Sequence, residues 1–160
     1  MADWFVRGLP PLVFQPSTDE WICWAAAMES WLRVTPNRKV RTRDELVGLF
    51  QGDTDDSGAL LKKGLPRLIT MARMDVKAFP KSGPGLSLDF LYQKLVERGH
   101  LYLMFSSSGV GHANVVYAVD EELDYIGYMD PWPGMGYRSR SIGDFRDAAS
   151  EFLVGWPSRY

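Results

Sequence analysis

The chain has 160 residues, of which 46% are hydrophobic and 24% charged, and its formal net charge is −2. This size and composition indicate one globular domain over residues 1–160, and they do not favour nucleic-acid binding, which is usually marked by a basic domain. One cysteine excludes an internal disulfide, and one cysteine with two histidines excludes the common zinc sites. We therefore expect no metal and no nucleic-acid partner.

The sequence lacks the apolar segments of membrane and secreted proteins. No apolar run approaches the roughly 18 residues of a membrane-spanning helix, so we expect no membrane span. The N-terminal stretch MADWFVRGLPPLVFQ has no basic start followed by a long apolar segment, and it does not resemble a signal peptide. If the protein leaves its cell, we expect it to use another route.

The first half of the chain has the periodicity of helices. We expect the first helix over about 22–33. The sequence TRDE (42–45) is a capping box and predicts a short helix after it. A leucine stripe in 57–74 predicts another helix, bent or interrupted at Pro66. The segment SLDFLYQKLVERG (87–99) begins at a serine cap and ends at a glycine, as helices do.

After Gly99 the pattern changes to short aromatic and β-branched segments, which are typical of strands. Helices followed by strands indicate an α+β protein, with a helical lobe over about 15–98 and an antiparallel β-sheet lobe over about 99–160. Such a chain can hold a cleft between its lobes. The expected strands cover 100–105, 113–119, 124–130, 134–141 and 151–157.

The lone cysteine, Cys23, lies where the first helix is expected to begin, within WICWAAAMESW (21–31). Unpaired amide groups and the helix dipole at a helix N-terminus favour the thiolate, which is the nucleophilic form. A lone cysteine is more often a small buried hydrophobic residue, so its position alone assigns no role. Trp21 and Trp31 fit the core or the wall of a cleft.

His112 follows the Gly/Ser loop SSSGVG (106–111) and stands at the start of a strand. Gly111 leaves room for a substrate backbone to approach this histidine. His100 also starts a strand but has no such loop before it, so we interpret it as structural. His112 is therefore the candidate partner of the cysteine.

Asp130 is brought to His112 by the expected hairpin. The strands over 113–119 and 124–130 flank a short polar turn, so antiparallel pairing sets Asp130 opposite residue 113 or 114. Its carboxylate could then accept a hydrogen bond from one imidazole nitrogen and present the other nitrogen to Cys23. This is the arrangement of nucleophile, base and orienting group in a catalytic triad.

These pieces together resemble the papain-like cysteine peptidases, most closely the small bacterial forms: staphopain-like enzymes, effector peptidases of pathogens and bacteriocin-processing peptidase domains. The matching pieces are Q…CWAA, GHANVVYAVD and YMDPW, in the order Gln, Cys, His, Asp from residue 15 to residue 130. The resemblance implies a two-lobed papain-like fold. Its implied roles are Cys23 as nucleophile, His112 as general base and then acid, and Asp130 as the group that orients His112.

The resemblance also assigns supporting residues. Gln15 would donate to the oxyanion hole beside the Cys23 backbone N–H, Trp24 would pack next to the nucleophile, and Trp132 would shield the contact between histidine and carboxylate. Gln15 precedes Cys23 by eight residues, where the family usually has five or six. The segment between them must therefore bulge, or another donor must serve, and the nearest substitutes are Ser17 and Thr18.

The implied activity is that of a thiol hydrolase, without cofactor, acting on a peptide bond of a protein substrate. No pro-segment is visible, so we expect control by export, by delivery into a target cell or by a separate inhibitory protein of the immunity type. These features favour a secreted bacterial effector or toxin, active in the cytoplasm of a target cell. The alternatives on the same frame are a cell-wall amidase, a glutamine deamidase or an acyl transferase, and the alternative of another class is a catalytically inactive binding module.

Overall fold

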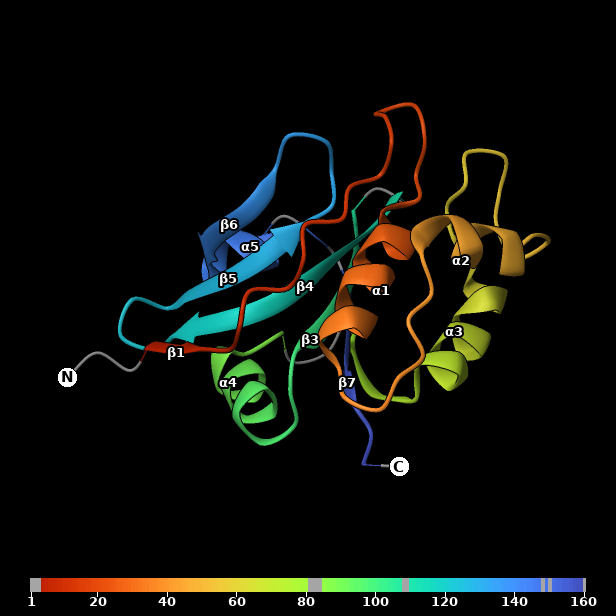
Figure 1. The fold of residues 1–160 in the computed structure, drawn as a ribbon. Coiled ribbons are helices and arrows are strands. Elements are labelled where there is room, and N and C mark those ends of the chain that lie inside the picture. The colour runs from red at the N-terminus through yellow and green to blue at the C-terminus, as the bar shows by residue number, and fades with distance from the viewer. Residues whose placement is uncertain (1–3, 81–84, 108–109, 148, 150, 160) are drawn as a thin grey trace.

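In the computed structural model, an antiparallel sheet forms the centre of the molecule (Figure 1). The structure describes residues 4–80, 85–107, 110–147, 149 and 151–159. Six strands lie in the order β2-β7-β3-β4-β5-β6, and β1 pairs with β4 outside this path. The strands are β1 (Trp4–Val6), β2 (Met74–Phe79), β3 (Leu101–Ser107), β4 (Val110–Asp120), β5 (Tyr125–Asp130), β6 (Gly136–Ser141) and β7 (Glu151–Pro157).

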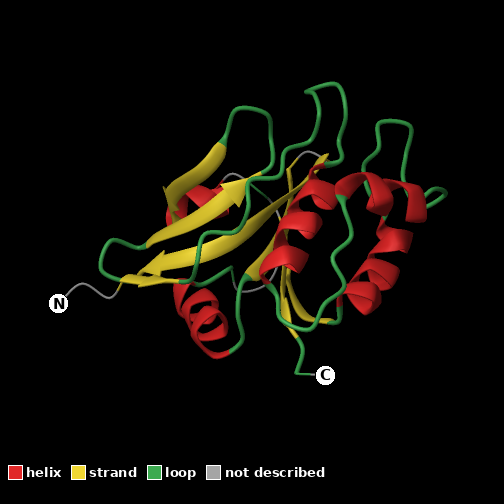
Figure 2. Cartoon of the chain, in the orientation of Figure 1, coloured by secondary structure: helices red, strands yellow, loops and turns green. Residues whose placement is uncertain are grey.

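Helices cover both faces of this sheet (Figure 2). The first three α-helices pack on one face and the last two on the other. Both faces of the central strands are therefore buried. The helices are α1 (Cys23–Val34), α2 (Arg43–Leu49), α3 (Leu65–Ala72), α4 (Leu88–Glu97) and α5 (Ile142–Asp147), with a short 3-10 helix, η1 (Lys62–Gly64).

Alternate residues of the central strands face two separate hydrophobic clusters. Tyr102 on β3 and Val115 on β4 pack with α1, α2 and α3. Leu103 and Val116, their neighbours along the same strands, pack with α4 and α5. This is the two-residue period of a strand. Because both clusters are apolar, the central strands are marked by β-branched and aromatic residues rather than by alternating polarity.

The helix α1, which begins at the cysteine, is fixed tightly on β3. Residues 25–27 are three alanines without any exposed surface, so the helix backbone approaches the sheet closely. The Tyr102 hydroxyl donates to the Trp24 carbonyl at 2.8 Å. At the other end of the helix, Trp31 Nε1 donates to the His100 carbonyl at 2.9 Å. These two bonds set the height of the helix N-terminus above the sheet.

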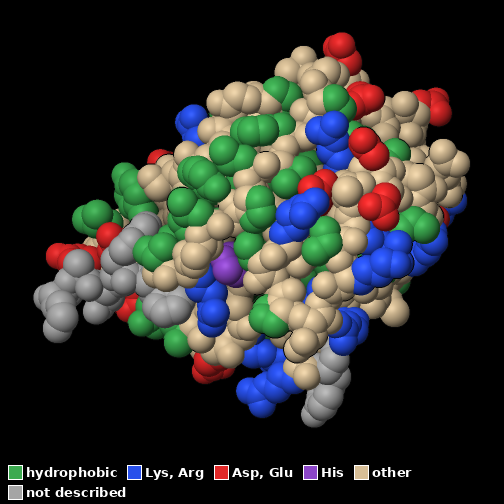
Figure 3. All heavy atoms as spheres, viewed as in Figure 1, with side chains coloured by type: hydrophobic (Ala, Val, Ile, Leu, Met, Phe, Trp, Pro, Cys, Tyr) green, Lys and Arg blue, Asp and Glu red, His purple; other side chains and the backbone are tan. Residues whose placement is uncertain are grey.

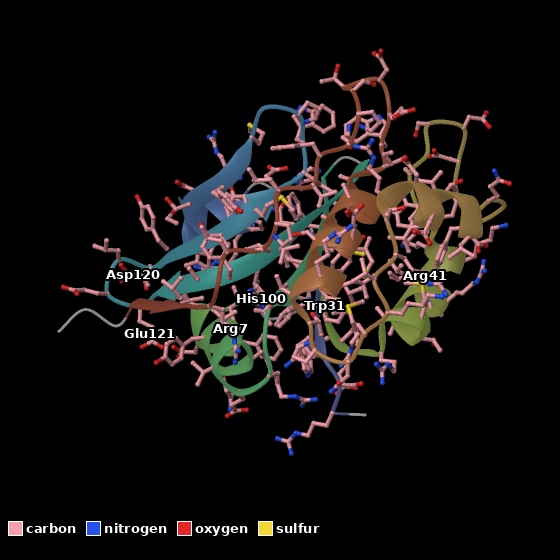
Figure 4. All side chains as sticks on the ribbon, viewed as in Figure 1. Arg7, Trp31, Arg41, His100, Asp120 and Glu121 are labelled. Carbon is pink, nitrogen blue, oxygen red and sulfur yellow. The ribbon has the colours of Figure 1, made fainter. Side chains whose placement is uncertain are left out.

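Residues 7–15, which we call the N-terminal strap, cross the molecule from α4 to the site of Cys23 (Figures 1 and 4). Arg7 Nε donates to the Leu95 carbonyl at the end of α4, at 2.6 Å. Four side chains from elsewhere in the chain then donate to backbone carbonyls of the strap. These donors are His100 Nε2 to Gly8 (2.6 Å), Tyr137 Oη to Pro10 (2.6 Å), Ser30 Oγ to Pro11 (2.7 Å) and Arg43 to Phe14.

The strap contributes exposed apolar side chains to the surface. Hydrophobic side chains gather over the strap and over β5 and β6 on the face shown in Figure 3. Leu9 is 58% exposed, Leu12 48% and Met135 40%. The strap is therefore held mainly by the hydrogen bonds that its backbone carbonyls accept from other parts of the chain. Burial of its own side chains contributes less.

Most of the expected elements are confirmed. Thr42 and Glu45 form the capping box at the start of α2. Ser87 accepts a hydrogen bond from Phe90 N at the start of α4. All five expected strands of the second half occur, as β3 to β7, with ends that shift by a few residues. The α+β class is therefore correct.

The segment 57–74 differs from the long helix expected there. It holds η1 followed by α3, and Pro66 lies in the first turn of α3 instead of bending a longer helix. Proline fits a first turn because the N–H that it lacks has no partner within the helix there. The helix ends at Arg73, whose backbone is left-handed with a φ of 55°.

Helical and strand segments are also less separated along the chain than expected. β1 and β2, both from the first half, pair with β4 and β7, and α5 lies beside β6 in the second half. β2 is an edge strand that exposes Asp75 and Lys77. Its apolar pattern is therefore too weak to mark it as a strand in the sequence.

Candidate active site

Cys23 is the first residue of α1 and lies at the end of β4 where His112 stands. No side chain caps the start of α1. The Ala25 and Ala26 N–H groups donate to the Ile22 carbonyl, whereas the N–H groups that begin a helix have no partner within it. The thiol is buried, at 2% exposure, and its Sγ donates to the Gly111 carbonyl at 3.8 Å. The helix N-terminus thus holds the sulfur against the strand that carries the imidazole.

The pairing of β4 with β5 brings Asp130 to His112. Val115 pairs with Met129, so one further step in the register places Asp130 opposite residue 114. His112 Nε2 lies 2.7 Å from Asp130 Oδ1. The Trp132 backbone N–H donates to the same oxygen at 2.9 Å, which fixes the carboxylate from the other side.

The surroundings of His112 strongly favour its charged form. Burial is the largest influence and lowers the pKa of His112, but hydrogen bonds to Asp130 and Cys23, with the charges of both, outweigh it and raise the pKa to about 10. The imidazole thus keeps its proton at neutral pH when the thiol is ionised. A thiolate beside an imidazolium is the reactive form of a cysteine nucleophile.

Aromatic rings enclose the imidazole. Trp132 meets it edge-on with ring centroids 6.3 Å apart, and Phe105 does so from β3 at 5.3 Å. Trp21 packs on Trp132 at 5.1 Å. These rings limit the access of water to the bond between His112 and Asp130, and a low local dielectric strengthens such a bond.

Trp24 lies away from the imidazole, on the side of α2. It is 2% exposed, its Nε1 donates to the Gly58 carbonyl at 2.8 Å, and its ring meets Phe50 edge-on. The residue after the cysteine therefore packs α1 against α2 and the loop before η1. It supports the position of the helix and does not contact the reacting groups.

Gln15 is buried beside the loop that follows β5, which contains Pro131 and Trp132. Its backbone N–H donates to the Pro131 carbonyl at 3.0 Å. Its side-chain Nε2 donates to the Ser17 carbonyl at 2.7 Å and to the Glu20 carbonyl at 2.6 Å. The segment between Gln15 and Cys23 therefore folds back around the Gln15 amide, which accommodates the longer spacing.

Both amide hydrogens of Gln15 are consequently engaged with the backbone. The other amide atom, Oε1, is buried without a hydrogen-bond partner among the described residues. The side chain of Ser17 accepts from the Asp19 backbone N–H at 3.2 Å. The backbone N–H of Cys23 belongs to the first turn of α1, where helix N–H groups have no partner within the helix.

A cavity of about 320 Å³ opens beside Gly111, whose carbonyl contacts the thiol. Apolar side chains of β3, β7 and the segment before α3 form most of its wall, with Lys62 and Glu151 among the lining residues. Its other apolar lining includes Leu60, Leu65, Met104, Phe105, Phe152 and Leu153.

The described part of the chain contains no group of three or more side chains suited to bind a metal ion. Within the same residues, no helix is both long enough and apolar enough to cross a membrane.

Phe105 was not predicted as a neighbour of His112, although the sequence holds a signal for it. The Gly/Ser sequence SSSGVG separates two apolar segments, and the antiparallel pairing of β3 with β4 sets Phe105 opposite His112. The cavity next to it could not be foreseen, because its wall combines segments that are distant in the sequence.

The fold and this site define the class of the protein as a papain-like cysteine peptidase. A family model described as the papain-like cysteine protease AvrRpt2 matches residues 10–150, and the chain belongs to this family. The expected papain-like fold and the class of enzyme are thereby confirmed. A comparison with curated proteins finds no match.

Solved structures support the fold. The peptidase domain of Streptococcus ComA, a bi-functional ABC transporter involved in quorum sensing, is 17% identical with a TM-score of 0.62, over 92% of this chain and 98% of that one. The same domain of Streptococcus mutans ComA in complex with a small-molecule inhibitor is 14% identical with a TM-score of 0.53, over 92% and 99%. At these identities the likeness concerns the fold alone.

Proposed function

We propose that this peptidase hydrolyses a peptide bond in a protein substrate through a triad of Cys23, His112 and Asp130. The observation that supports this most directly is the 2.7 Å contact of His112 Nε2 with Asp130 Oδ1, made by an imidazole that also bonds the thiol of Cys23. The bond to Asp130 uses Nε2, which leaves the other ring nitrogen of His112 for the nucleophile.

The reaction follows from this arrangement. The thiolate of Cys23 attacks the carbonyl carbon, and the oxygen that becomes negative is stabilised by the Cys23 backbone N–H at the start of α1. The imidazolium of His112 then gives its proton to the leaving amine, which leaves an acyl-enzyme. His112 next takes a proton from water, which attacks the thioester and releases the acid.

Gln15 is the second proposed donor to the oxyanion. Its position beside Pro131 and the start of α1 supports this role, since it is buried at the same end of the sheet as the triad. Because Nε2 already bonds Ser17 and Glu20, donation to the oxyanion requires the exchange of one of these bonds when substrate binds.

The apolar cavity beside Gly111 is the proposed site for a hydrophobic substrate side chain. A cavity of about 320 Å³ holds one large side chain, and it lies on the side of His112 that faces Phe105. Burial of such a side chain would position the peptide bond over the thiol.

We also propose the biological setting that the sequence resemblance favours. The enzyme would act as a bacterial effector or toxin, delivered into a target cell, and a separate inhibitory protein would restrain it in the producing cell. The resemblance to effector peptidases supports this part of the proposal.

The decisive experiment maps new protein N-termini in cells that express the active chain and the Cys23→Ala variant. A set of cleavages that requires Cys23 supports the proposal, and the residues before each cleavage test the apolar cavity. Release of fragments from purified peptidoglycan without new protein N-termini would assign a cell-wall amidase instead. Failure of a thiol-reactive probe to label Cys23 faster than a free thiol would assign an inactive binding module.

A further inference from the structure

Asn114 is a buried polar residue without a visible hydrogen-bond partner. It lies on β4, two residues after His112, and is 1% exposed. Neither Nδ2 nor Oδ1 of its amide has a partner among the described residues. Buried polar groups are nearly always hydrogen-bonded, and an apolar residue at this position would avoid the cost of an unpaired amide. The presence of asparagine here therefore requires an explanation other than packing.

The strand register places Asn114 next to the triad. The pairs of Val115 with Met129 and of Val116 with Tyr128 set Asn114 opposite Asp130 on β5. Because side chains alternate along a strand, Asn114 and His112 share one face of the sheet. Directly opposed residues of antiparallel strands have Cβ atoms about 5 Å apart. The amide of Asn114 thus lies within reach of the carboxylate, directly or across one water.

The carboxylate of Asp130 has capacity for a further donor. Within the described residues, its hydrogen bonds from His112 Nε2 and from the Trp132 backbone N–H both go to Oδ1. An ionised carboxylate accepts at both oxygens. A buried water typically bonds about three polar groups that the protein leaves unpaired. The unpaired amide and the second carboxylate oxygen lie on the same face of two paired strands.

We infer that Asn114 is a positioning residue of the triad: its Nδ2 donates to a buried water, and this water donates to Oδ2 of Asp130. The inference rests on the proposed function of Asp130. A donor at Oδ2 fixes the plane of the carboxylate, so that Oδ1 stays directed at the imidazole of His112. The amide is neutral, so it stabilises the carboxylate without competing with His112 as a counter-charge.

Among the described residues, the titratable and charged groups that act on His112 and on its neighbour Tyr128 belong to three elements. Cys23 meets His112 from α1, and Asp130 meets it from β5. Tyr128, on the same face of β5, feels the charges of Asp130 and of two arginines from β6, Arg138 and Arg140. The Asn114 amide has no charge of its own, so its removal changes the titration of His112 through the carboxylate.

The test is an NMR titration of the His112 ring in the wild-type protein and in Asn114→Leu. Leucine has a similar size and removes the amide. We expect the His112 midpoint to fall by about one pH unit and kcat/KM at neutral pH to fall about 10-fold, as for the loss of a hydrogen bond to a charged group. Thermal stability should change little, because the apolar leucine side chain at this buried position offsets the loss of the water bridge.

This combination separates positioning from structure, since a merely structural asparagine would lower stability and leave the titration in place. A His112 midpoint equal to the wild-type value overturns the inference. If the Asn114→Leu variant does not fold, the His112 titration is repeated in Asn114→Ala, which also lacks the amide. Asn114→Ser keeps a hydrogen-bond donor and leaves space for a water molecule. Its His112 midpoint should therefore stay close to the wild-type value.

Leu103→Val is the matched packing control, because Leu103 pairs with Asn114 from β3. It should lower stability without moving the His112 midpoint. The titration needs no substrate, so its outcome does not depend on which bond the enzyme cleaves. An unchanged midpoint with full activity would reject the role of Asn114 alone, whereas a Cys23→Ala variant that stays active would reject the proposed function.

Discussion

His112 and Asp130 are joined by a 2.7 Å hydrogen bond that runs diagonally across two paired strands. The register of β4 and β5 places Asp130 opposite residue 114, two positions further along β4 than His112. A shift of one residue in this pairing would turn either side chain to the opposite face of the sheet. The site therefore depends on the same register that builds the two hydrophobic clusters.

Replacement of the nucleophile should separate activity from folding. Cys23→Ala removes a buried sulfur but leaves the contacts of residues 25–27 and Trp31 that hold α1. We expect no measurable peptide hydrolysis, with a melting temperature within a few degrees of the wild type. Turnover by a clean preparation of this variant would contradict the nucleophile assignment.

Alanine substitution of the two histidines should have opposite effects on activity and stability. His112→Ala removes the base and should abolish hydrolysis. His100→Ala removes the bond from Nε2 to Gly8 and should lower the melting temperature while the turnover number stays near the wild-type value. Thermal unfolding and steady-state kinetics of both variants check this pair, and a dead enzyme from His100→Ala with an active His112→Ala would reverse the assignments.

The pH dependence should reflect the raised pKa of His112. Burial lowers this pKa, but the bonds and charges of Asp130 and Cys23 outweigh it and raise it from 6.5 to about 10. We expect kcat/KM to fall on the alkaline side near pH 10, where the imidazolium loses its proton. The charged pair should stabilise the fold fully below pH 6.5, and this contribution should be lost as the pH rises through about 10.

Asp130→Asn should move that alkaline limb to lower pH, since the variant keeps the shape of the side chain but removes its charge. Asp130→Ala should lower kcat/KM more than Asp130→Asn, and less than the loss of Cys23 or His112, because an orienting group is partly dispensable. An alkaline limb that is the same in Asp130→Asn and in the wild type would show that this carboxylate does not hold the proton on His112.

Gln15→Ala should affect both the loop and the reaction. The lost bonds to Ser17 and Glu20 contribute about 1 kcal/mol each, so the melting temperature should fall. If the amide also donates to the oxyanion, kcat should fall roughly 10²- to 10³-fold with little change in KM. Alkylation of Cys23 by a small reagent should persist. A lower melting temperature with an unchanged kcat would assign Gln15 to the loop only.

The apolar cavity can be tested by filling it. Leu153 contributes to its wall from β7, and Leu153→Trp should raise KM for a peptide substrate because less space remains for a hydrophobic side chain. Alkylation of Cys23 by iodoacetamide should proceed at the wild-type rate, since this reagent is too small to need the cavity. Equal KM values for wild type and variant would place the substrate elsewhere.

The central elements of the fold were predictable because their signals are local. The capping box at Thr42 and the serine cap at Ser87 each specify a helix start within four residues. The hairpin that sets Asp130 near His112 follows from a turn of four residues and the two-residue period of strands. The contact between His112 and Asp130 was therefore foreseeable from residues close together in the sequence.

The parts that were missed depend on distant contacts. β2 is a strand because it pairs with β7, which lies far along the chain. Paired residues are 73 positions apart at Phe79↔Phe152 and 83 apart at Met74↔Pro157, and no local pattern predicts this pairing. The Gln15 amide is engaged by the backbone of its own loop, which depends on how that loop packs under Pro131. The significance of Asn114 emerges only when its neighbours on β3 and β5 are known.

The N-terminal strap has a consequence for the order of folding. Its bonds join residues 88 positions apart at Arg7 and Leu95, 92 apart at Gly8 and His100, and 127 apart at Pro10 and Tyr137. Contacts of such separation form late, after local helices and hairpins. On the ribosome the strap cannot dock until β6 has emerged, and the strap leads directly into the loop that holds Gln15. The nascent chain thus carries an incomplete site through most of its synthesis, and we expect proteolysis only once these contacts have formed.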